Sequence, residues 1–281
     1  YASAAEPARS PAAVRMSEVK IAPIPDLGQR TDEITIYAGP CSVESAEQFD
    51  EVAECIADLG LTWIRGGAFK PRTNPHSFQG LGEEALKIMK SAGDKYGLKT
   101  LTEVMDSAHC QLVADYVDGL QVGARNFQNF SLLKKIGEVT ADTHQMVLYK
   151  RGFAGTIAEW LAATDYITDH GNTNVVLCER GIRTFETATR FTLDIAAVPV
   201  IHKQSLYPVC IDVSHPAGQR DLVPSLAKAA IAAGADSLMI EVHPNPPVAL
   251  SDGPQQLTPA QFRELIAELR ELAACLGKKI V

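Results

Sequence analysis

Eight short apolar runs recur along this chain, and each ends within a few residues of a charged or metal-ligating side chain. They cover residues 34–39, 62–64, 99–102, 119–123, 146–149, 175–178, 209–211 and 238–240. Segments with helical spacing of apolar side chains separate the runs. This alternation predicts the α/β class and a (β/α)8 TIM barrel. In that fold the ends of the strands meet at one face, which carries the chemistry.

The segments between the strands predict helices because apolar side chains repeat there every three or four residues. These helices are expected over residues 49–57, 81–95, 132–139, 156–168 and 224–233. Thr258 is expected to cap a last helix, with Pro259 at its first position. The longest stretch without a periodic pattern, residues 66–79, follows the second expected strand. Because barrels connect their elements tightly, we expect this loop to be functional.

Size and composition are those of one globular barrel. The chain has 281 residues and a mass of 30.3 kDa. We expect residues 33–281 to form a single catalytic barrel and the Ala- and Pro-rich residues 1–32 to form a flexible leader. The net charge of −8 argues against nucleic-acid binding, and no apolar run is long enough to predict a membrane span. Six cysteines without paired spacing favour reduced thiols and a cytoplasmic location.

A candidate metal site combines one thiol, one imidazole and two carboxylates. Its residues are Cys41, His215, Glu241 and Asp252. This mixture of soft and hard donors suits Mn, Fe, Co or Zn better than Mg or Ca. A lone cysteine or histidine is more often structural, but the occurrence of these residue types together at three strand ends favours a divalent metal.

Cations form a second group at the expected strand ends. They are Arg65, Lys70, Arg72, Arg125, Lys150, Arg151, Arg180 and Arg183. The ordinary interpretation of such residues is a solvated surface charge, but most of these follow a strand of buried type. A buried cation needs an anionic partner, so two anionic substrates would explain the number of cations. Alternatively, Glu103 and Glu179 neutralise them. Arg72 and Thr73, in the long loop, would suit one phosphate.

Several segments together resemble one enzyme family. They are residues 38–45 (AGPCSVES), 65–73 (RGGAFKPRT), 123–126 (GARN), 150–152 (KRG), 178–184 (CERGIRT), 214–215 (SH) and 239–244 (MIEVHP). On these segments the chain resembles the type I-beta group of 3-deoxy-D-arabino-heptulosonate 7-phosphate (DAHP) synthases. The likeness runs from about residue 34 to about residue 269, nearly the whole expected barrel.

The resemblance implies a metal-dependent aldol-type condensation of phosphoenolpyruvate with erythrose 4-phosphate, which gives DAHP and phosphate in the first step of the shikimate pathway. It implies that Cys41, His215, Glu241 and Asp252 are the metal ligands and that Lys70, His215 and Cys41 are catalytic. The implied phosphoenolpyruvate site comprises Arg65, Lys70, Ala124, Arg125, Lys150 and Arg180. Arg72 and Thr73 are implied to bind erythrose 4-phosphate.

The expected assembly is a homo-oligomer, either a dimer or a tetramer. Family members are often regulated through an appended domain. The stretch of about 33 residues before the first expected strand is short for an independent core. A separate chorismate mutase is therefore a possible partner, and we expect the chain by itself to be insensitive to phenylalanine and tyrosine.

Other functions stay open from the sequence. The sister enzyme 3-deoxy-D-manno-octulosonate 8-phosphate synthase shares the barrel, but it carries Lys-Ala-Asn-Arg-Ser-Ser where this chain has Lys-Pro-Arg-Thr at residues 70–73. Val213, Gln219 and residues 153–155 depart from the usual family pattern, which leaves room for a related sugar-phosphate synthase of secondary metabolism. A barrel that senses phosphorylated metabolites, or a partner-binding subunit, is the alternative from another class.

Overall fold

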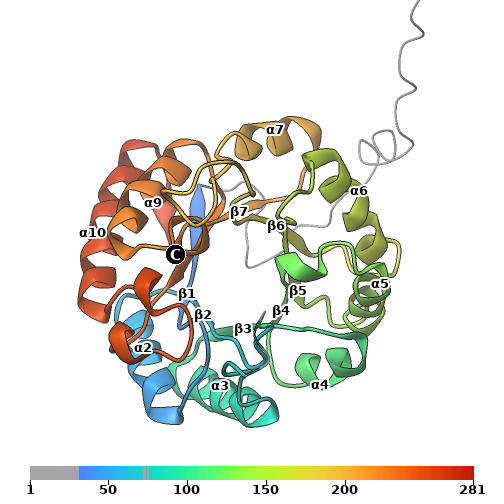
Figure 1. Cartoon of the computed structure of the whole chain (residues 1–281), viewed down its shortest axis with the longest axis horizontal. Helices are drawn as coiled ribbons and strands as arrows, with labels where there is room; N and C mark the ends of the chain where they lie inside the picture. The colour runs from blue at the N-terminus through green and yellow to red at the C-terminus, as the bar shows by residue number, and fades with distance from the viewer. Residues whose placement is uncertain (1–31, 72–73, 75) are drawn as a thin grey trace, which may run out of the picture.

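A computed structural model describes residues 32–71, 74 and 76–281. Within this part of the chain, eight parallel strands close into a barrel, because β1 pairs with β8 on one side and with β2 on the other. The helices form a ring around the strands (Figure 1). The predicted (β/α)8 TIM barrel is therefore confirmed. The expected leader, residues 1–32, lies outside the described residues except for Asp32.

The strands occur at the positions predicted from the apolar runs. They are β1 (Glu33–Gly39), β2 (Trp63–Arg65), β3 (Lys99–Glu103), β4 (Gly119–Val122), β5 (Met146–Lys150), β6 (Val175–Glu179), β7 (Val209–Asp212) and β8 (Ser237–Glu241). A short strand that the sequence analysis did not predict, β9 (Lys279–Ile280), pairs with the start of β1.

One α-helix follows each barrel strand, except that two helices, α8 and α9, follow β7. The α-helices are α2 (Ala46–Asp58), α3 (Glu83–Tyr96), α4 (Cys110–Ala114), α5 (Phe130–Val139), α6 (Ile157–Thr168), α7 (Ala197–Gln204), α8 (Ser214–Ala217), α9 (Val223–Ala232) and α10 (Pro259–Cys275). The predicted cap of the last helix is confirmed, because the Thr258 side chain accepts a hydrogen bond from the Gln261 N–H and Pro259 begins α10.

Alternating side chains along the strands build two apolar layers. Outward-facing residues such as Ile36 and Ala38 pack under the helices in the large core. Inward-facing residues form a second cluster inside the barrel, where Tyr37 and Trp63 meet edge to face with ring centroids 5.5 Å apart. Because successive strand residues point to opposite sides, the same short runs fill both layers. The barrel interior is thus filled with side chains.

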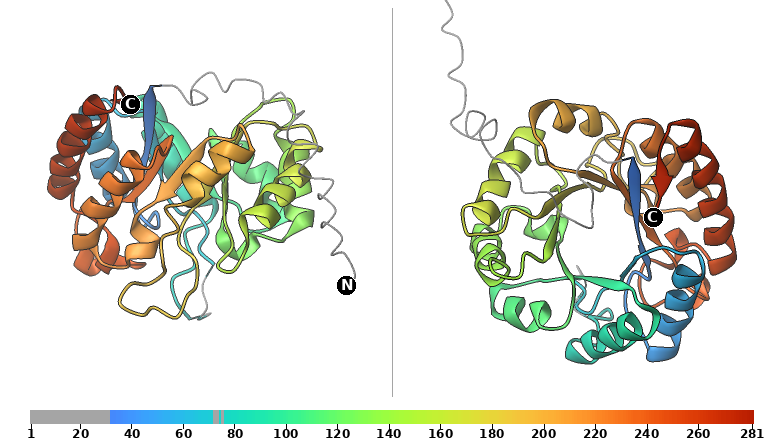
Figure 2. Two further views of the ribbon diagram at one scale, coloured as in Figure 1. Left: turned by 90° about the horizontal axis from the view of Figure 1, so that it is seen from above. Right: turned by 180° about the vertical axis from the view of Figure 1, so that it is seen from behind.

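Two long loops extend from the carboxyl ends of the strands. The loop 66–82, between β2 and α3, contains the predicted segment 66–79. The loop 180–196, between β6 and α7, is equally long and was not singled out by the sequence analysis. Its charged residues and its short bridge between Ile182 and Thr192 gave no helical or strand-like periodicity to recognise. The described parts of both loops project from the same end of the barrel (Figure 2).

The described loops also contain five short 3-10 helices: η1 (Ser107–His109), η2 (Ala124–Asn126), η3 (Arg220–Leu222), η4 (Pro246–Val248) and η5 (Gly253–Gln255). Among the described residues, no helix has both the length and the apolar character needed to cross a bilayer.

Candidate active site at the carboxyl ends of the strands

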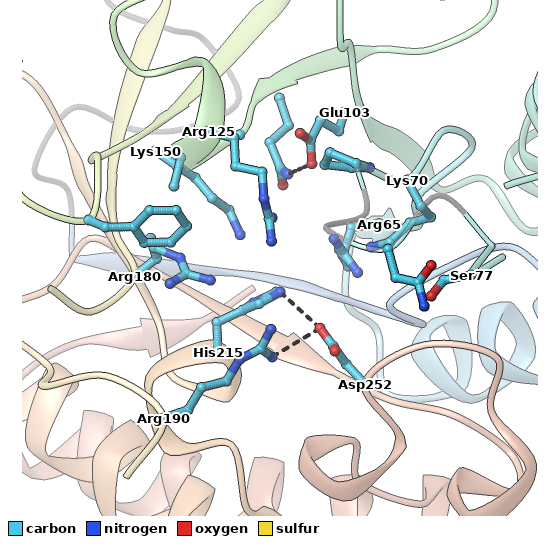
Figure 3. Close-up of a pocket in the computed structure, with 16 residues that line it drawn as sticks. Arg65, Lys70, Ser77, Glu103, Arg125, Lys150, Arg180, Arg190, His215 and Asp252 are labelled. Carbon is cyan, nitrogen blue, oxygen red and sulfur yellow. Dashed lines mark hydrogen bonds and ion pairs between the residues drawn. The ribbon is translucent and has the colours of Figure 1, made fainter. Parts of the chain in front are cut away.

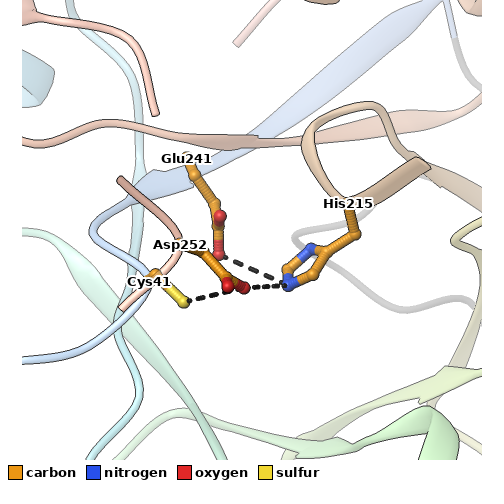
Figure 4. A group of neighbouring side chains, drawn as sticks. All are labelled: Cys41, His215, Glu241 and Asp252. Carbon is orange, nitrogen blue, oxygen red and sulfur yellow. Dashed lines mark hydrogen bonds and ion pairs between the residues drawn. The ribbon is translucent and has the colours of Figure 1, made fainter. Parts of the chain in front are cut away.

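The four predicted metal ligands lie together at the barrel mouth (Figure 4). Cys41 follows β1, His215 lies in α8, Glu241 ends β8, and Asp252 lies in the loop beyond it. One ligand atom from each side chain lies within 4.8 Å of the other three. Asp252 Oδ2 is 3.6 Å from Cys41 Sγ, and His215 Nε2 is 3.5 Å from Glu241 Oε1. Residues far apart in sequence thus form one compact donor group.

The orientation of His215 suits metal binding. Asp212 Oδ2 lies 2.7 Å from Nδ1, and because a carboxylate only accepts, Nδ1 carries the proton. Burial lowers the pKa of His215, which favours the neutral ring. Nε2 then directs its lone pair toward Glu241 and Asp252, at 3.5 and 3.8 Å. A carboxylate behind the ring is the usual support of a metal-binding histidine, so the residues present fit a divalent ion.

The Cys41 thiol is buried beside Lys70. Burial and the neighbouring Glu241 raise the pKa of Cys41 to about 12. Lys70 Nζ lies 3.1 Å from Cys41 Sγ and donates to the Cys41 carbonyl at 2.9 Å. A coordinated cation removes the proton from a thiol. A divalent ion bound here would therefore supply the positive charge that stabilises the Cys41 thiolate. Lys70 is therefore placed directly against the donor group.

A cavity of about 290 Å³ opens beside this group. Its charged lining is mostly cationic (Figure 3). The cations are Arg65, Lys70, Arg125, Lys150, Arg180 and Arg190. Glu103 and Asp252 are the two carboxylates that line it among the described residues. The lining therefore suits a ligand with more than one negative charge.

Two of the cations that line the cavity form ion pairs with carboxylates in or beside the donor group. Lys150 Nζ donates to Asp212 Oδ2 at 2.6 Å, and Arg65 Nη1 lies 3.2 Å from Glu241 Oε1. Asp212 is completely buried and serves both Lys150 and His215, so it couples the cation site to the donor group. The sequence analysis gave Asp212 no role, although it directly follows the predicted strand 209–211 and lies three residues before His215.

Arg151 belongs to the scaffold rather than to the cavity. Its Nη1 atom lies 2.9 Å from Glu179 Oε2 and 2.7 Å from Asp194 Oδ2. The alternative that Glu179 neutralises a cation is therefore correct for Arg151. Glu103 accepts a hydrogen bond from the Gln121 amide at 3.1 Å, and no ion pair joins it to a cation within the described ranges.

Arg190 is a cavity residue that the sequence analysis missed. It lies far along the loop 180–196, whereas the search for cations followed the first residues after each strand. Its guanidinium lies 3.1 Å from Asp252 Oδ2 and donates to Gln255 Oε1 at 2.9 Å. Asp252 has a φ of 47°, a left-handed backbone conformation that aspartate tolerates better than most residues. Arg190 thus helps to hold the strained loop that carries Asp252.

The structure places most of the remaining predicted substrate residues around the cavity. Ala124 and Arg125 reach it from η2, and Lys150 and Arg180 reach it from the ends of β5 and β6. Arg72 and Thr73, the predicted aldehyde-phosphate residues, lie outside the described residues. Their neighbours Asn74 and Ser77 line the cavity.

The fold and the cavity define a class: a (β/α)8 barrel that gathers cations for a small anion beside a mixed-donor, metal-type cluster. Residues 26–276 match the model of the DAHP synthetase I family, and the chain belongs to this family.

Two named relatives illustrate its position in the family. This chain is 52% identical over 246 residues to the phospho-2-dehydro-3-deoxyheptonate aldolase of Thermotoga maritima. The match covers 88% of this chain and 72% of that protein. It is 32% identical over 262 residues to the 2-dehydro-3-deoxyphosphooctonate aldolase of Caulobacter vibrioides, covering 85% and 87% of the two chains. A crystal structure of the Thermotoga maritima aldolase, a DAHP synthase, superposes with a TM-score of 0.85, covering 89% of this chain and 72% of that one.

Proposed function

We propose that this chain is a DAHP synthase, which condenses phosphoenolpyruvate with erythrose 4-phosphate and water to give DAHP and inorganic phosphate. The observation that carries the proposal is the cation-lined cavity beside the Cys41, His215, Glu241 and Asp252 group, in a barrel of the DAHP synthetase I family. The 52% identity with a DAHP synthase, against 32% with an octulosonate-phosphate synthase, favours the four-carbon aldehyde.

The four-residue donor group would hold one divalent ion, with Mn, Fe, Co or Zn as the candidates. When bound, such an ion supplies Lewis-acid polarisation of the aldehyde oxygen or orientation of water. Cys41, His215, Glu241 and Asp252 are its proposed ligands. Asp212 holds the His215 ring in the ligating orientation from behind.

We propose that different cations bind the two substrates. Arg65, Arg125, Lys150 and Arg180, with Ala124 beside them, are proposed to bind the carboxylate and phosphate of phosphoenolpyruvate. Arginine offers paired donors to such groups and lysine offers a point charge. Arg72 and Thr73 are proposed to bind the phosphate of erythrose 4-phosphate, which would place its aldehyde toward the donor group. A rigid barrel holds both substrates in reacting geometry.

The condensation forms a bond between the methylene carbon of phosphoenolpyruvate and the aldehyde carbon. Positive charge develops at the enol carbon, where water adds, and the resulting hemiketal phosphate releases phosphate. Lys70 Nζ, beside Cys41 Sγ at 3.1 Å, is proposed to deliver the proton that the new alkoxide requires. Glu241 and His215 are the alternative proton carriers. Arg125 and Arg180 would hold the departing phosphate.

The resemblance of the sequence motifs to type I-beta DAHP synthases supports further proposals on the subgroup, the pathway and the assembly. We assign the chain to the type I-beta group, in the shikimate pathway of aromatic amino-acid biosynthesis, as a homo-oligomer with a chorismate mutase as a possible separate partner. Its six cysteines are free thiols, which supports a reducing compartment such as the cytoplasm.

The function is tested by following phosphate release from phosphoenolpyruvate with erythrose 4-phosphate and, separately, with arabinose 5-phosphate. We expect turnover with the four-carbon sugar, loss of turnover in chelator, and recovery with Mn²⁺ or Co²⁺. A preference for the five-carbon sugar would instead identify an octulosonate-phosphate synthase. Tight binding of the sugar phosphates without turnover in any metal would identify a sensor.

A further inference from the structure

Three arginines surround one phenylalanine at the cavity mouth. The guanidinium carbons of Arg180, Arg125 and Arg183 lie 4.9, 5.8 and 5.6 Å from the centroid of the Phe153 ring. Phe153 itself stacks on Phe191, with centroids 5.1 Å apart and an angle of 8° between the rings. Arg180 also contacts Phe191, at 4.4 Å from its centroid. These distances fall within the range of cation–π interactions.

The three arginines differ from Arg65, Lys150 and Arg190, because none of the three forms an ion pair with a carboxylate of the described residues. Arg65, Lys150 and Arg190 each form an ion pair with a buried or half-buried carboxylate. No ion pair in the described part of the chain involves Arg125, Arg180 or Arg183. Among the described residues, the mouth thus contains three cations in ion pairs with carboxylates and, around Phe153, three arginines without such a pair. Lys70, which lies against Cys41, has no ion pair with a described carboxylate either.

Arg180 shows the consequence most clearly. It is 4% exposed, and its Nε and Nη1 atoms are buried with no hydrogen-bond partner among the described residues. Burial lowers the pKa of Arg180, which reflects the cost of keeping this charge away from water. Buried donors are normally satisfied, so a guanidinium that lines the cavity while two of its donors lack a partner points to an anion bound beside it.

An aromatic face can hold a guanidinium without consuming its donors. A carboxylate would accept the N–H groups and cancel the charge, and it would then compete with an anionic substrate. The quadrupole of a phenyl ring attracts the cation through its face but accepts no in-plane N–H hydrogen bond. Phe153 comes from the loop after β5 and Phe191 from the loop after β6. A backbone hydrogen bond joins the two loops, because the Arg183 N–H donates to the Phe153 carbonyl at 2.7 Å.

We propose that Phe153 is a positioning residue for phosphoenolpyruvate, a role that rests on the proposed function. Its ring holds Arg180 and Arg125 in place of a carboxylate and so leaves their donors free for the substrate phosphate. Arg180 and Arg125 bind the anion directly, whereas Phe153 acts through them. Erythrose 4-phosphate, which is assigned to the loop 66–82, is not affected by this contact.

The test compares Phe153→Leu and Phe153→Met, which remove the ring but keep apolar volume, with Phe153→Tyr, which keeps the ring. Phe130→Leu is the matched control, because Phe130 is 38% exposed and stacks on Tyr166 with centroids 4.4 Å apart. No arginine of the described residues lies over its ring. Each variant is loaded with Mn²⁺. We measure KM for both substrates, kcat, and the binding of phosphoenolpyruvate by calorimetry below the unfolding temperature.

We expect Phe153→Leu and Phe153→Met to raise KM and Kd for phosphoenolpyruvate roughly three- to thirtyfold, the loss expected for one or two cation–π contacts. KM for erythrose 4-phosphate should stay within about twofold, and Phe153→Tyr and Phe130→Leu should behave like the parent chain. Unchanged phosphoenolpyruvate binding in the Leu and Met variants would overturn the proposal, as would equal losses of binding for both substrates. It would also be overturned if Phe153→Tyr, which keeps the ring, lost as much phosphoenolpyruvate affinity as the Leu and Met variants. A parent chain that binds phosphoenolpyruvate but releases no phosphate would refute the proposed function instead.

Discussion

Replacing Asp212 by asparagine is expected to weaken metal binding and phosphoenolpyruvate binding together. Asp212 is completely buried, and its Oδ2 atom accepts from Lys150 Nζ at 2.6 Å and from His215 Nδ1 at 2.7 Å. Its Oδ1 atom accepts from the backbone N–H groups of Ser214 and His215. In Asp212→Asn the amide oxygen keeps the backbone contacts, so the NH2 group faces two donors. His215 would then favour the tautomer with its proton on Nε2, which cannot bind a metal.

The magnitude follows from the lost hydrogen bonds. A hydrogen bond to a charged group contributes about 1.5–3 kcal/mol, and loss of the carboxylate behind a metal-binding histidine costs roughly 10- to 100-fold in affinity. We expect Kd for Mn²⁺ or Zn²⁺ to rise by that factor in competition with a chelating dye. KM for phosphoenolpyruvate should rise as well, by roughly tenfold or more, because Lys150 loses its anchor.

Asp236→Asn is the matched control. Asp236 accepts from His202 Nε2 at 2.7 Å and from the Val209 N–H at 2.8 Å, but it lies at the opposite end of the barrel, just before β8. This variant should lower the midpoint of thermal unfolding without changing metal affinity. The reasoning would be refuted by an Asp212→Asn variant with the parent affinity for metal, or by an equal loss of metal affinity in Asp236→Asn.

Three further predictions test the ligands, the aldehyde site and the backbone at the mouth. Chelator should abolish phosphate release and Mn²⁺ should restore it, but Cys41→Ala should recover little activity because one of four ligands is gone; full activity of Cys41→Ala in chelator would contradict this. Arg72→Ala should raise KM for erythrose 4-phosphate about tenfold or more, since a charged hydrogen bond is lost, and equal effects on both substrates would count against the division of the site. Gly39→Ala should destabilise the fold by several kcal/mol, measured as the free energy of unfolding in urea, because Gly39 has a φ of 149° and an added Cβ would overlap the Arg65 carbonyl. Gly60→Ala, at a φ of 65° with no atom within 4 Å of the added Cβ, should cost only about 1–2 kcal/mol; equal losses in the two variants would refute the steric argument.

The barrel and the donor group could be predicted from the sequence because both follow from patterns of neighbouring residues. Each strand is a short apolar run that must be buried on both faces, and the parallel order places the residue after each run at a common mouth. Cys41 and Glu241 could therefore be predicted to meet, although 200 residues separate them. His215 follows β7 so closely that the same reasoning reached it.

The sequence by itself determined that this chain folds into a barrel with cations and metal-type donors at one end, because hydrophobic periodicity and strand order are properties of consecutive residues. Only the tertiary structure decided which charges are paired. Asp212 holds both Lys150 and His215, Arg151 turns to Glu179, and Arg180 lies against two aromatic rings. Such pairings depend on distances of a few ångströms between loops of irregular backbone, and irregular loops such as 180–196 have no period from which those distances can be read.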